Sequence, residues 1–157
     1  SMQCGETVNA SVLDGHEVVY VARSNPPRYV SIGYLVGVRI PAHVVTPGVV
    51  MLAAMEAAAA ERWIAGHDFV SFTAQTVTDV VRFREELREA REQDFWTTLG
   101  QLDPGLRGIA VALKDRKGRC LGALSMTVQS TSYSGEQAQE RLLPLLRDAA
   151  QDLRPLL

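Results

Sequence analysis

The alternation of apolar and polar positions predicts an antiparallel hairpin near the start of the chain. Residues 7–13 and 17–22 alternate valine and other apolar residues with small or polar ones, and they flank the sequence Asp14-Gly15-His16. Glycine adopts a positive φ at no steric cost, so this tripeptide is typical of a tight turn between paired strands. Further extended chain, interrupted by two glycines, is expected from Tyr29 to Ile40.

The apolar spacing changes after Thr46, where a long helix is predicted. Thr46 is a frequent N-cap residue, Pro47 suits the first helical position, and Gly66 follows a helical segment that extends to about Ala65. Glu56 is the only polar side chain in the first part of this helix. A helix that is apolar nearly all round is buried, so we expect this one to pack against the sheet.

A second, amphipathic helix is predicted to start near Thr78 or Asp79, because apolar residues then recur at helical spacing. Its apolar face consists of Val80, Phe83, Leu87 and Ala90. Strands are expected at about 95–99, 108–113 and 119–129.

The last predicted helix opens with a capping box, Ser134 followed by Gln137, and extends towards Leu153. Pro144 should kink or break it. Strands outnumber helices and hairpins dominate, so the predicted fold is α+β, with a mainly antiparallel sheet and helices packed on it.

Composition excludes several classes of protein. The chain has 157 residues, 46% of them hydrophobic, which suits a single compact domain over 1–157. Its 16 basic residues are balanced by 18 acidic ones, which argues against a nucleic-acid surface. No apolar segment is long enough for a membrane span, and the two cysteines, Cys4 and Cys120, form no disulfide framework. We therefore expect a cytoplasmic protein that does not bind membranes.

Catalytic and metal-binding patterns are weak in this sequence. The three histidines, His16, His43 and His67, lack partners at metal-ligand spacing, and no nucleophile elbow, phosphate loop or zinc-protease helix is present. An enzyme that uses His43 or Cys120 is kept as an alternative. The favoured expectation is no catalytic residue, no metal and no cofactor.

Two local features could form a ligand site. Along 119–129, alternation places Cys120, Leu124, Met126 and Val128 on one face, and Leu121, Ala123, Ser125 and Thr127 on the other. The two hydroxyls suit the floor of a pocket, although an ordinary exposed face gives the same pattern. Similarly, Thr46-Pro47-Gly48 starts a helix, where unpaired N–H groups attract anions, although plain capping explains it equally well.

Three segments in order resemble the effector-binding domain of the IclR (isocitrate lyase regulator) family of bacterial transcription regulators. They are Gly5 to Asn9 with Val12 to Gly15 and Glu17 to Val21; Val36 to His43 followed by Gly48; and Gly105 to Val111 with Asp115 and Gly118-Arg119. Val21-Ala22-Arg23, Ser31-Ile32 and Val36-Gly37 look most like the subgroup that regulates aromatic-acid catabolism through the β-ketoadipate pathway.

The resemblance implies a GAF-like fold, a twisted antiparallel sheet with helices on it, and a buried pocket for a small organic acid. It also implies a homodimer or tetramer, and DNA binding only through an N-terminal winged helix-turn-helix domain that this sequence lacks, so we expect a fragment of a longer protein. Carried over position by position, the effector-binding residues are Tyr29, Ile32, Ile40, Thr46, Pro47, Thr98, Leu106, Gly108, Ser125 and Thr127.

The chain departs from the family pattern at the predicted pocket. Pro47 has no N–H, Val49 replaces the usual basic residue, and 97–101 replaces an acidic segment. Gly108 stands where a small side chain is usual. These departures predict a larger and less charged pocket, and an aromatic or dicarboxylic acid as effector. The alternative is a degenerate sensor that has lost its ligand and serves only for oligomerisation.

Overall fold

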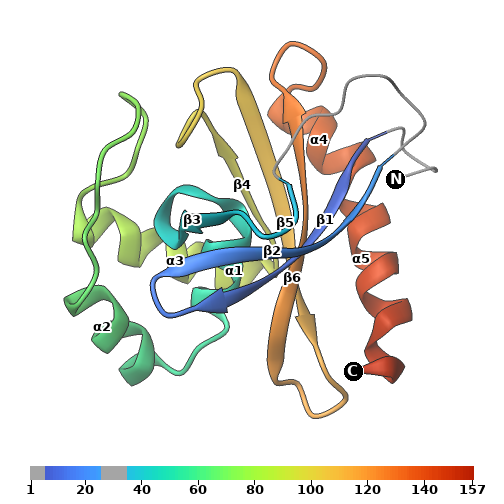
Figure 1. Ribbon diagram of the computed structural model, residues 1–157, viewed down its shortest axis with the longest axis horizontal. Helices are drawn as coiled ribbons and strands as arrows, with labels where there is room; N and C mark the ends of the chain where they lie inside the picture. Colours follow the sequence, from blue (N-terminus) through green and yellow to red (C-terminus); the bar gives the residue numbers. More distant parts are fainter. Residues whose placement is uncertain (1–5, 26–34) are drawn as a thin grey trace.

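One six-stranded antiparallel sheet organises the computed structural model, which describes residues 6–25 and 35–157 (Figure 1). Its strand order is β3-β2-β1-β6-β5-β4. The strands are β1 Val8–Asp14, β2 Glu17–Ser24, β3 Arg39–Pro41, β4 Trp96–Leu99, β5 Leu106–Lys114 and β6 Cys120–Gln129. The predicted first hairpin is confirmed, since β1 pairs with β2 and Gly15 has a φ of 62° in the turn. The first half of the predicted 29–40 segment, residues 29–34, lies outside the described residues, and β3 begins at Arg39 in the second half.

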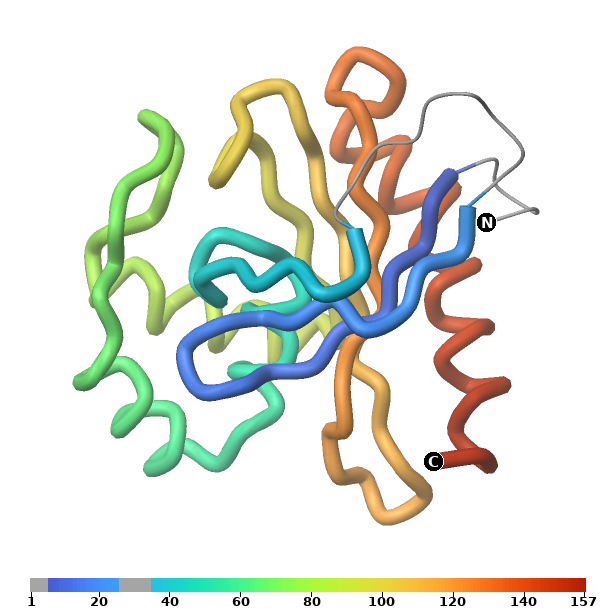
Figure 2. Tube along the Cα trace, in the orientation of Figure 1, coloured from blue at the N-terminus to red at the C-terminus, as the bar shows by residue number. Residues whose placement is uncertain are grey.

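Helices cover both faces of the sheet, with α1 to α3 on one side and α4 and α5 on the other (Figures 1 and 2). The helices are η1 Ala42–Val44, α1 Thr46–Ala53, α2 Ala57–Ala65, α3 Val80–Gln93, α4 Gly135–Arg141, α5 Leu143–Leu153 and η2 Arg154–Leu156. Each face packs its own apolar cluster, one centred on α1 and one against α5. The predicted α+β class with a twisted antiparallel sheet is confirmed. None of the helices in the described ranges combines the length and apolar character needed to cross a bilayer.

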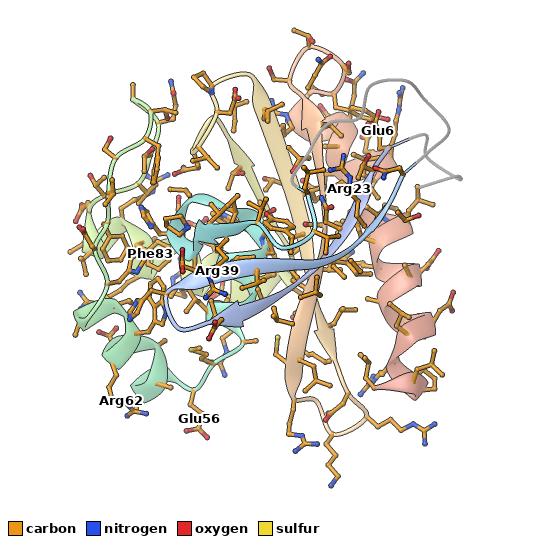
Figure 3. All side chains as sticks on the ribbon, viewed as in Figure 1. Glu6, Arg23, Arg39, Glu56, Arg62 and Phe83 are labelled. Atoms are coloured by element: carbon orange, nitrogen blue, oxygen red, sulfur yellow. The ribbon has the colours of Figure 1, made fainter. Side chains whose placement is uncertain are left out.

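The predicted helix from Thr46 to Ala65 is two helices, and this prediction was wrong. All eight residues of α1 are buried, whereas α2 buries only Trp63 and Ile64. The break falls at Glu56, which has extended backbone (φ −60°, ψ 146°) and heads α2. In a single straight helix, Glu56 would continue the buried segment of α1. Burying its unpaired carboxylate would be costly. The break brings Glu56 to the surface, where it points away from the fold (Figure 3).

Helix signals that depend only on neighbouring residues are confirmed. Asp79 caps α3 by accepting a hydrogen bond from Val81 N, and Ser134 and Gln137 form the predicted capping box. Pro144 marks the break between α4 and α5 and lies in the first turn of α5. There its missing N–H costs no helical hydrogen bond.

Cys120 lies on the opposite face of β6 from the prediction. The β5–β6 register shifts so that Leu113 pairs with Gly122 and Lys114 with Cys120, which leaves Leu121 as an extra residue. An extra residue reverses the alternation of the side chains before it. Cys120 therefore packs against the α1 cluster, while Leu124, Met126 and Val128 belong to the α5 cluster as predicted.

Candidate functional site

Three neighbouring strands bring a row of small side chains beneath the start of α1. Gly108 in β5 is paired with Thr98 of β4 on one side and with Thr127 of β6 on the other. A Cβ atom on Gly108 would lie 3.0 Å from Thr98 Oγ1 and 3.1 Å from Thr46 Oγ1. The glycine therefore lets two threonine side chains, one from β4 and one from α1, approach the sheet at this point.

A small cavity of about 20 Å³ opens beside this row. The predicted site residues that line it are Thr46, Pro47, Thr98, Leu106, Gly108 and Thr127. Lining residues that the sequence reasoning missed are Tyr20, Val44, Val45, Gln101, Leu102 and Asp103. The structure thus brings together residues from β2, α1, the end of β4, the start of β5 and the end of β6, and the two farthest apart in the chain are Tyr20 and Thr127.

Of the remaining predicted site residues, the described Ile40 and Ser125 do not line this cavity. Ile40 is 6% exposed and belongs to the α1 cluster. Ser125 is 2% exposed and lies two residues before Thr127 on the same face of β6. Tyr29 and Ile32 lie outside the described residues.

Hydrogen bonding leaves polar groups available in the cavity. The structure begins α1 at Thr46 with Val45 as N-cap, one residue earlier than predicted, and no side chain caps this end. In the described part of the chain, the hydroxyls of Thr46, Thr98 and Thr127 have no hydrogen-bond partner. Pro47 has no N–H group, so the backbone donors at the amino end of the helix are those of Thr46 and Gly48.

The cavity has little charge and little room. Asp103 is the only ionisable acid or base among its described lining residues apart from Tyr20. A volume of about 20 Å³ is room for roughly one water molecule. The space that the sequence predicted at Gly108 is filled by Thr46 and Thr98. The described residues therefore do not form the larger pocket that the sequence predicted.

A buried polar cluster continues the floor of the cavity under α1. Asn9 and Ser11 of β1 are 0% and 1% exposed, and Asn9 is paired with Ser125 across the β1–β6 ladder. The side-chain amide of Asn9 and the hydroxyls of Ser11 and Ser125 have no partner among the described residues. Buried unpaired polar groups of this kind cost roughly 1–3 kcal/mol each, so folds retain few of them.

Sequence reasoning missed Asn9 and Ser11 because a polar residue at every second position of a hairpin strand normally faces solvent. Here both faces of the sheet are covered by helices, so the polar face of β1 is buried. The signal was present in the alternation of Thr7, Asn9 and Ser11 with Val8 and Ala10. What was missing was the knowledge that α1 lies over that face.

The three histidines form one hydrogen-bonded chain next to the cavity. His43 Nε2 lies 2.8 Å from Val70 O, His43 Nδ1 lies 2.7 Å from His67 Nε2, and His67 Nδ1 lies 2.9 Å from His16 Nδ1. A carbonyl oxygen can only accept, so His43 Nε2 donates to Val70 O, and its Nδ1 accepts from His67 Nε2 when the ring is neutral. By the same logic His67 Nδ1 accepts from His16, and every ring has one defined tautomer.

Burial disfavours a positive charge on His43 and on His67. It lowers the pKa of His43, and with the neighbouring His43 and His16 it lowers the pKa of His67 to about 4. Trp63 stacks on His67 with ring centroids 4.0 Å apart, and Phe69 contacts it edge-on at 4.7 Å. The hydrogen-bonded histidines hold η1 against the segment after α2. Val44 of η1 lines the cavity.

The enzyme alternative has no supporting geometry in the described residues. Both ring nitrogens of His43 are engaged by Val70 O and His67, so this ring is not placed as a base for the Thr46 hydroxyl. The Cys120 thiol lies 3.4 Å from Gly122 O, and burial raises its pKa, which disfavours the reactive thiolate. No group of three or more potential metal ligands occurs in the described ranges.

Comparisons with known proteins agree with the fold. The family model for the C-terminal region of the bacterial transcriptional regulator IclR matches residues 1–154. The Pca regulon regulatory protein of Pseudomonas putida is 30% identical over 154 residues, which cover 98% of this chain and 53% of that protein. The p-hydroxybenzoate hydroxylase transcriptional activator of Acinetobacter baylyi is 33% identical over 159 residues, covering 98% of this chain and 59% of that protein.

Solved structures give the same result. The inducer-binding domain of an Acinetobacter PobR transcription factor double mutant, in complex with 3-hydroxybenzoic acid, superposes with a TM-score of 0.93 at 33% identity. That match covers 99% of this chain and 91% of the other. The C-terminal domain of the Escherichia coli regulator KdgR has a TM-score of 0.85 at 26% identity, over 97% of this chain and 87% of that one. This chain spans little more than half the length of the two matched regulators described above.

Proposed function

The chain belongs to the IclR family of bacterial transcription regulators, and on this premise we propose that it binds an aromatic carboxylic acid in the cavity at the start of α1. It corresponds to the effector-binding domain of these proteins, which regulate transcription and are not enzymes. The observation that carries the proposal is the convergence of the Thr98–Gly108–Thr127 row with the start of α1. A PobR domain of the same fold is complexed with 3-hydroxybenzoic acid.

The chemistry of the cavity suits a carboxylate attached to an apolar ring. The amino end of α1 and the free threonine hydroxyls supply hydrogen-bond donors for a carboxylate. Leu102, Leu106 and Val44 supply apolar walls for a ring. Beyond Thr127, the buried Asn9, Ser11 and Ser125 supply unpaired polar atoms for a ring substituent.

Binding requires the cavity to open, because about 20 Å³ does not hold an aromatic ring. A ligand that binds the open form better shifts the population towards it. We expect α1 or the 101–106 turn to move, and this movement is the means by which an effector changes the arrangement of the domains. Coupling of this kind is typically worth about 1–3 kcal/mol.

Thermal unfolding with 3-hydroxybenzoate, 4-hydroxybenzoate and benzoate tests this proposal. At about 100 times the dissociation constant, a ligand adds roughly 2.7 kcal/mol to the free energy of unfolding. For a domain of this size the midpoint rises by roughly 5–10 °C. The double variant Thr46→Val, Thr127→Val removes two hydroxyls with almost no change of shape, and it should lose most of this shift.

The matched control is Thr131→Val, which removes a hydroxyl at an exposed turn position. It should keep the full ligand-induced shift. An equal shift in the double variant and in the wild-type chain would show that the acid binds elsewhere.

The second candidate function is oligomerisation without a ligand. Two observations favour it: the small volume of the cavity and the N–H group that Pro47 removes. If none of the three acids raises the unfolding midpoint, and the chain forms dimers or tetramers in light scattering, this function replaces the first.

For the whole protein we propose a cytoplasmic homodimer or tetramer that binds DNA through an N-terminal winged helix-turn-helix domain. Its support is that the related Pca and p-hydroxybenzoate hydroxylase regulators are longer than this chain. Light scattering of this chain, with and without 3-hydroxybenzoate, measures the contribution of this domain to assembly. A monomer under both conditions would contradict it.

A further inference from the structure

A further cavity in the described part of the chain lies away from the Thr46 site. It is an open groove of about 680 Å³ between the end of α1, the end of α3, the second half of β5 and α5. Figure 1 shows α5 on one side of β5 and the α1–α3 layer on the other. The volume lies within the range of about 300–1,000 Å³ that is usual for small-molecule sites.

The groove is strongly cationic. Its lining includes Arg91 of α3, Lys114 of β5, Arg147 of α5 and Arg154, which follows α5 at the start of η2. Asp94 is the only acidic residue of this lining. Asp94 lies 3.9 Å from Lys114 Nζ and offsets only part of the charge. An excess of positive charge from three separate elements favours an anion with more than one acidic group.

Protein contacts position the cations without neutralising them. Arg147 donates to Gln93 O at 3.2 Å and lies over the Phe95 ring, and Arg154 donates to Asp115 O at 3.2 Å. These acceptors are backbone carbonyls, so the guanidinium charges remain uncompensated. Arg91 has no hydrogen-bond or ion-pair partner in the described ranges, so it is free to contact a ligand.

Small apolar side chains line part of the groove. Ala53, Ala90, Ala112 and Ala150 line it together with two valines. Ala112 also offers backbone groups, because β4 pairs with β5 only from Arg107 to Ala110. Gly100 N donates to Leu106 O, so Leu106 directs its backbone groups towards the β4 side. Backbone groups alternate along a strand, so Ala112 directs its own to the same side, where it has no strand partner.

We propose that this groove is a second ligand site, which binds an organic dianion with a flat apolar body, of the aromatic dicarboxylate class. The alanine surface takes the ring, and the cations of α3, β5 and α5 take the carboxylates. This site is separate from the Thr46 cavity and does not depend on the function proposed for it.

The two sites share α1. Thr46 and Pro47 line the first cavity, and Val50 and Ala53 of the same helix line the groove. The helix has eight residues and is about 12 Å long, so displacement of one end moves the other. A dianion in the groove should therefore change the affinity of the first cavity, and the reverse change must be equal.

Calorimetric titration with naphthalene-2,6-dicarboxylate tests the proposal on the wild-type chain. The variant Arg91→Gln, Lys114→Gln removes two charges that hold no essential contact, and it should weaken binding at least tenfold. Ala150→Leu narrows the groove without changing charge and should also weaken binding. Thr46→Val, Thr127→Val should bind the dicarboxylate as the wild-type chain does.

The matched control is Arg62→Gln, Arg141→Gln, which removes the same charge from exposed positions outside the groove. Arg62 points away from the fold on α2 (Figure 3). This control should bind within twofold of the wild-type chain. Equal losses in both charge variants, or inorganic phosphate that binds as tightly as the dicarboxylate, would overturn the proposal. A groove variant that changes the size of the oligomer but not the affinity for the dicarboxylate would also overturn the proposal, because the groove would then be a subunit interface.

Discussion

Gly108 is the residue at which the smallest substitution should most affect the effector cavity. In Gly108→Ala the new methyl group would lie 3.0 Å from Thr98 Oγ1 and 3.1 Å from Thr46 Oγ1. Both hydroxyls must move by a few tenths of an ångström, into the cavity. We expect the affinity for 3-hydroxybenzoate to fall at least fivefold, while the free energy of unfolding falls by about 1 kcal/mol or less.

Gly105→Ala is the control, because its methyl group would meet only Asp103 Oδ1 at 3.7 Å. Titration of both variants with 3-hydroxybenzoate separates an effect on the cavity from a general effect of alanine near β5. Unchanged affinity in Gly108→Ala would mean that the row of Thr98, Gly108 and Thr127 is not part of the site.

At the scale of residues, the sequence identified positions whose chemistry is local and missed those whose chemistry depends on packing. Thr46 and Thr127 were identified from the local pattern and again through the family resemblance, Gly108 was identified through the resemblance alone, and all three line one cavity. Asn9 was missed because its polar side chain alternates with apolar ones, as on an exposed strand. Its burial depends on α1, which follows it by more than 30 residues.

Helix α1 depends on one close approach between backbones. A Cβ atom on Gly48 would overlap the carbonyl group of Ala42 in η1, which is backbone and cannot rotate away. Gly48→Ala should therefore force α1 and η1 apart and lower the free energy of unfolding by about 3 kcal/mol. Urea unfolding followed by far-ultraviolet circular dichroism measures this loss.

Gly66→Ala is the matched control at the end of α2. Its methyl group would have no neighbour closer than 3.8 Å, and its φ of −98° suits alanine. We expect its stability to lie within about 0.5 kcal/mol of the wild-type chain. If Gly48→Ala were equally stable, the contact between η1 and α1 would not fix the position of the cavity.

At the scale of elements, helix ends encoded by neighbouring residues were predictable and interruptions with a tertiary cause were not. The capping box at Ser134 and the break at Pro144 follow from the chemistry of one turn. The break before Glu56 arises because the chain leaves the core there. The bulge at Leu121, which reverses the face of Cys120, arises from pairing with β5.

The histidine chain joins distant parts of the molecule. It connects the β1–β2 turn at His16, the end of α2 at His67 and η1 at His43. Trp63 also donates to Gly15 O at 2.9 Å, so the turn is held by two contacts. A proton on His67 would place a charge among Trp63, Phe69 and His43.

Stability should therefore fall with acidification. An unfolded histidine has a pKa near 6.5, while that of folded His67 is lowered to about 4. Between these values the unfolded chain binds more protons, so the free energy of unfolding decreases as the pH falls. This lowering of the His67 pKa corresponds to a loss of about 2 kcal/mol in the free energy of unfolding between pH 7 and pH 5. Partial exposure of His67 reduces the expected loss to about 1 kcal/mol.

His67→Phe tests this origin, because phenylalanine keeps the stacking on Trp63 and cannot be protonated. The variant should be less stable at pH 7, where it lacks both histidine hydrogen bonds, but its stability should change less between pH 7 and pH 5. Burial of Glu86 raises the pKa of that carboxyl and gives a contribution of opposite sign, which is common to both proteins and cancels in the comparison. Nitrogen NMR at pH 7 should find His67 protonated at Nε2 only. Parallel stability curves for the two proteins would assign the pH dependence to groups other than His67.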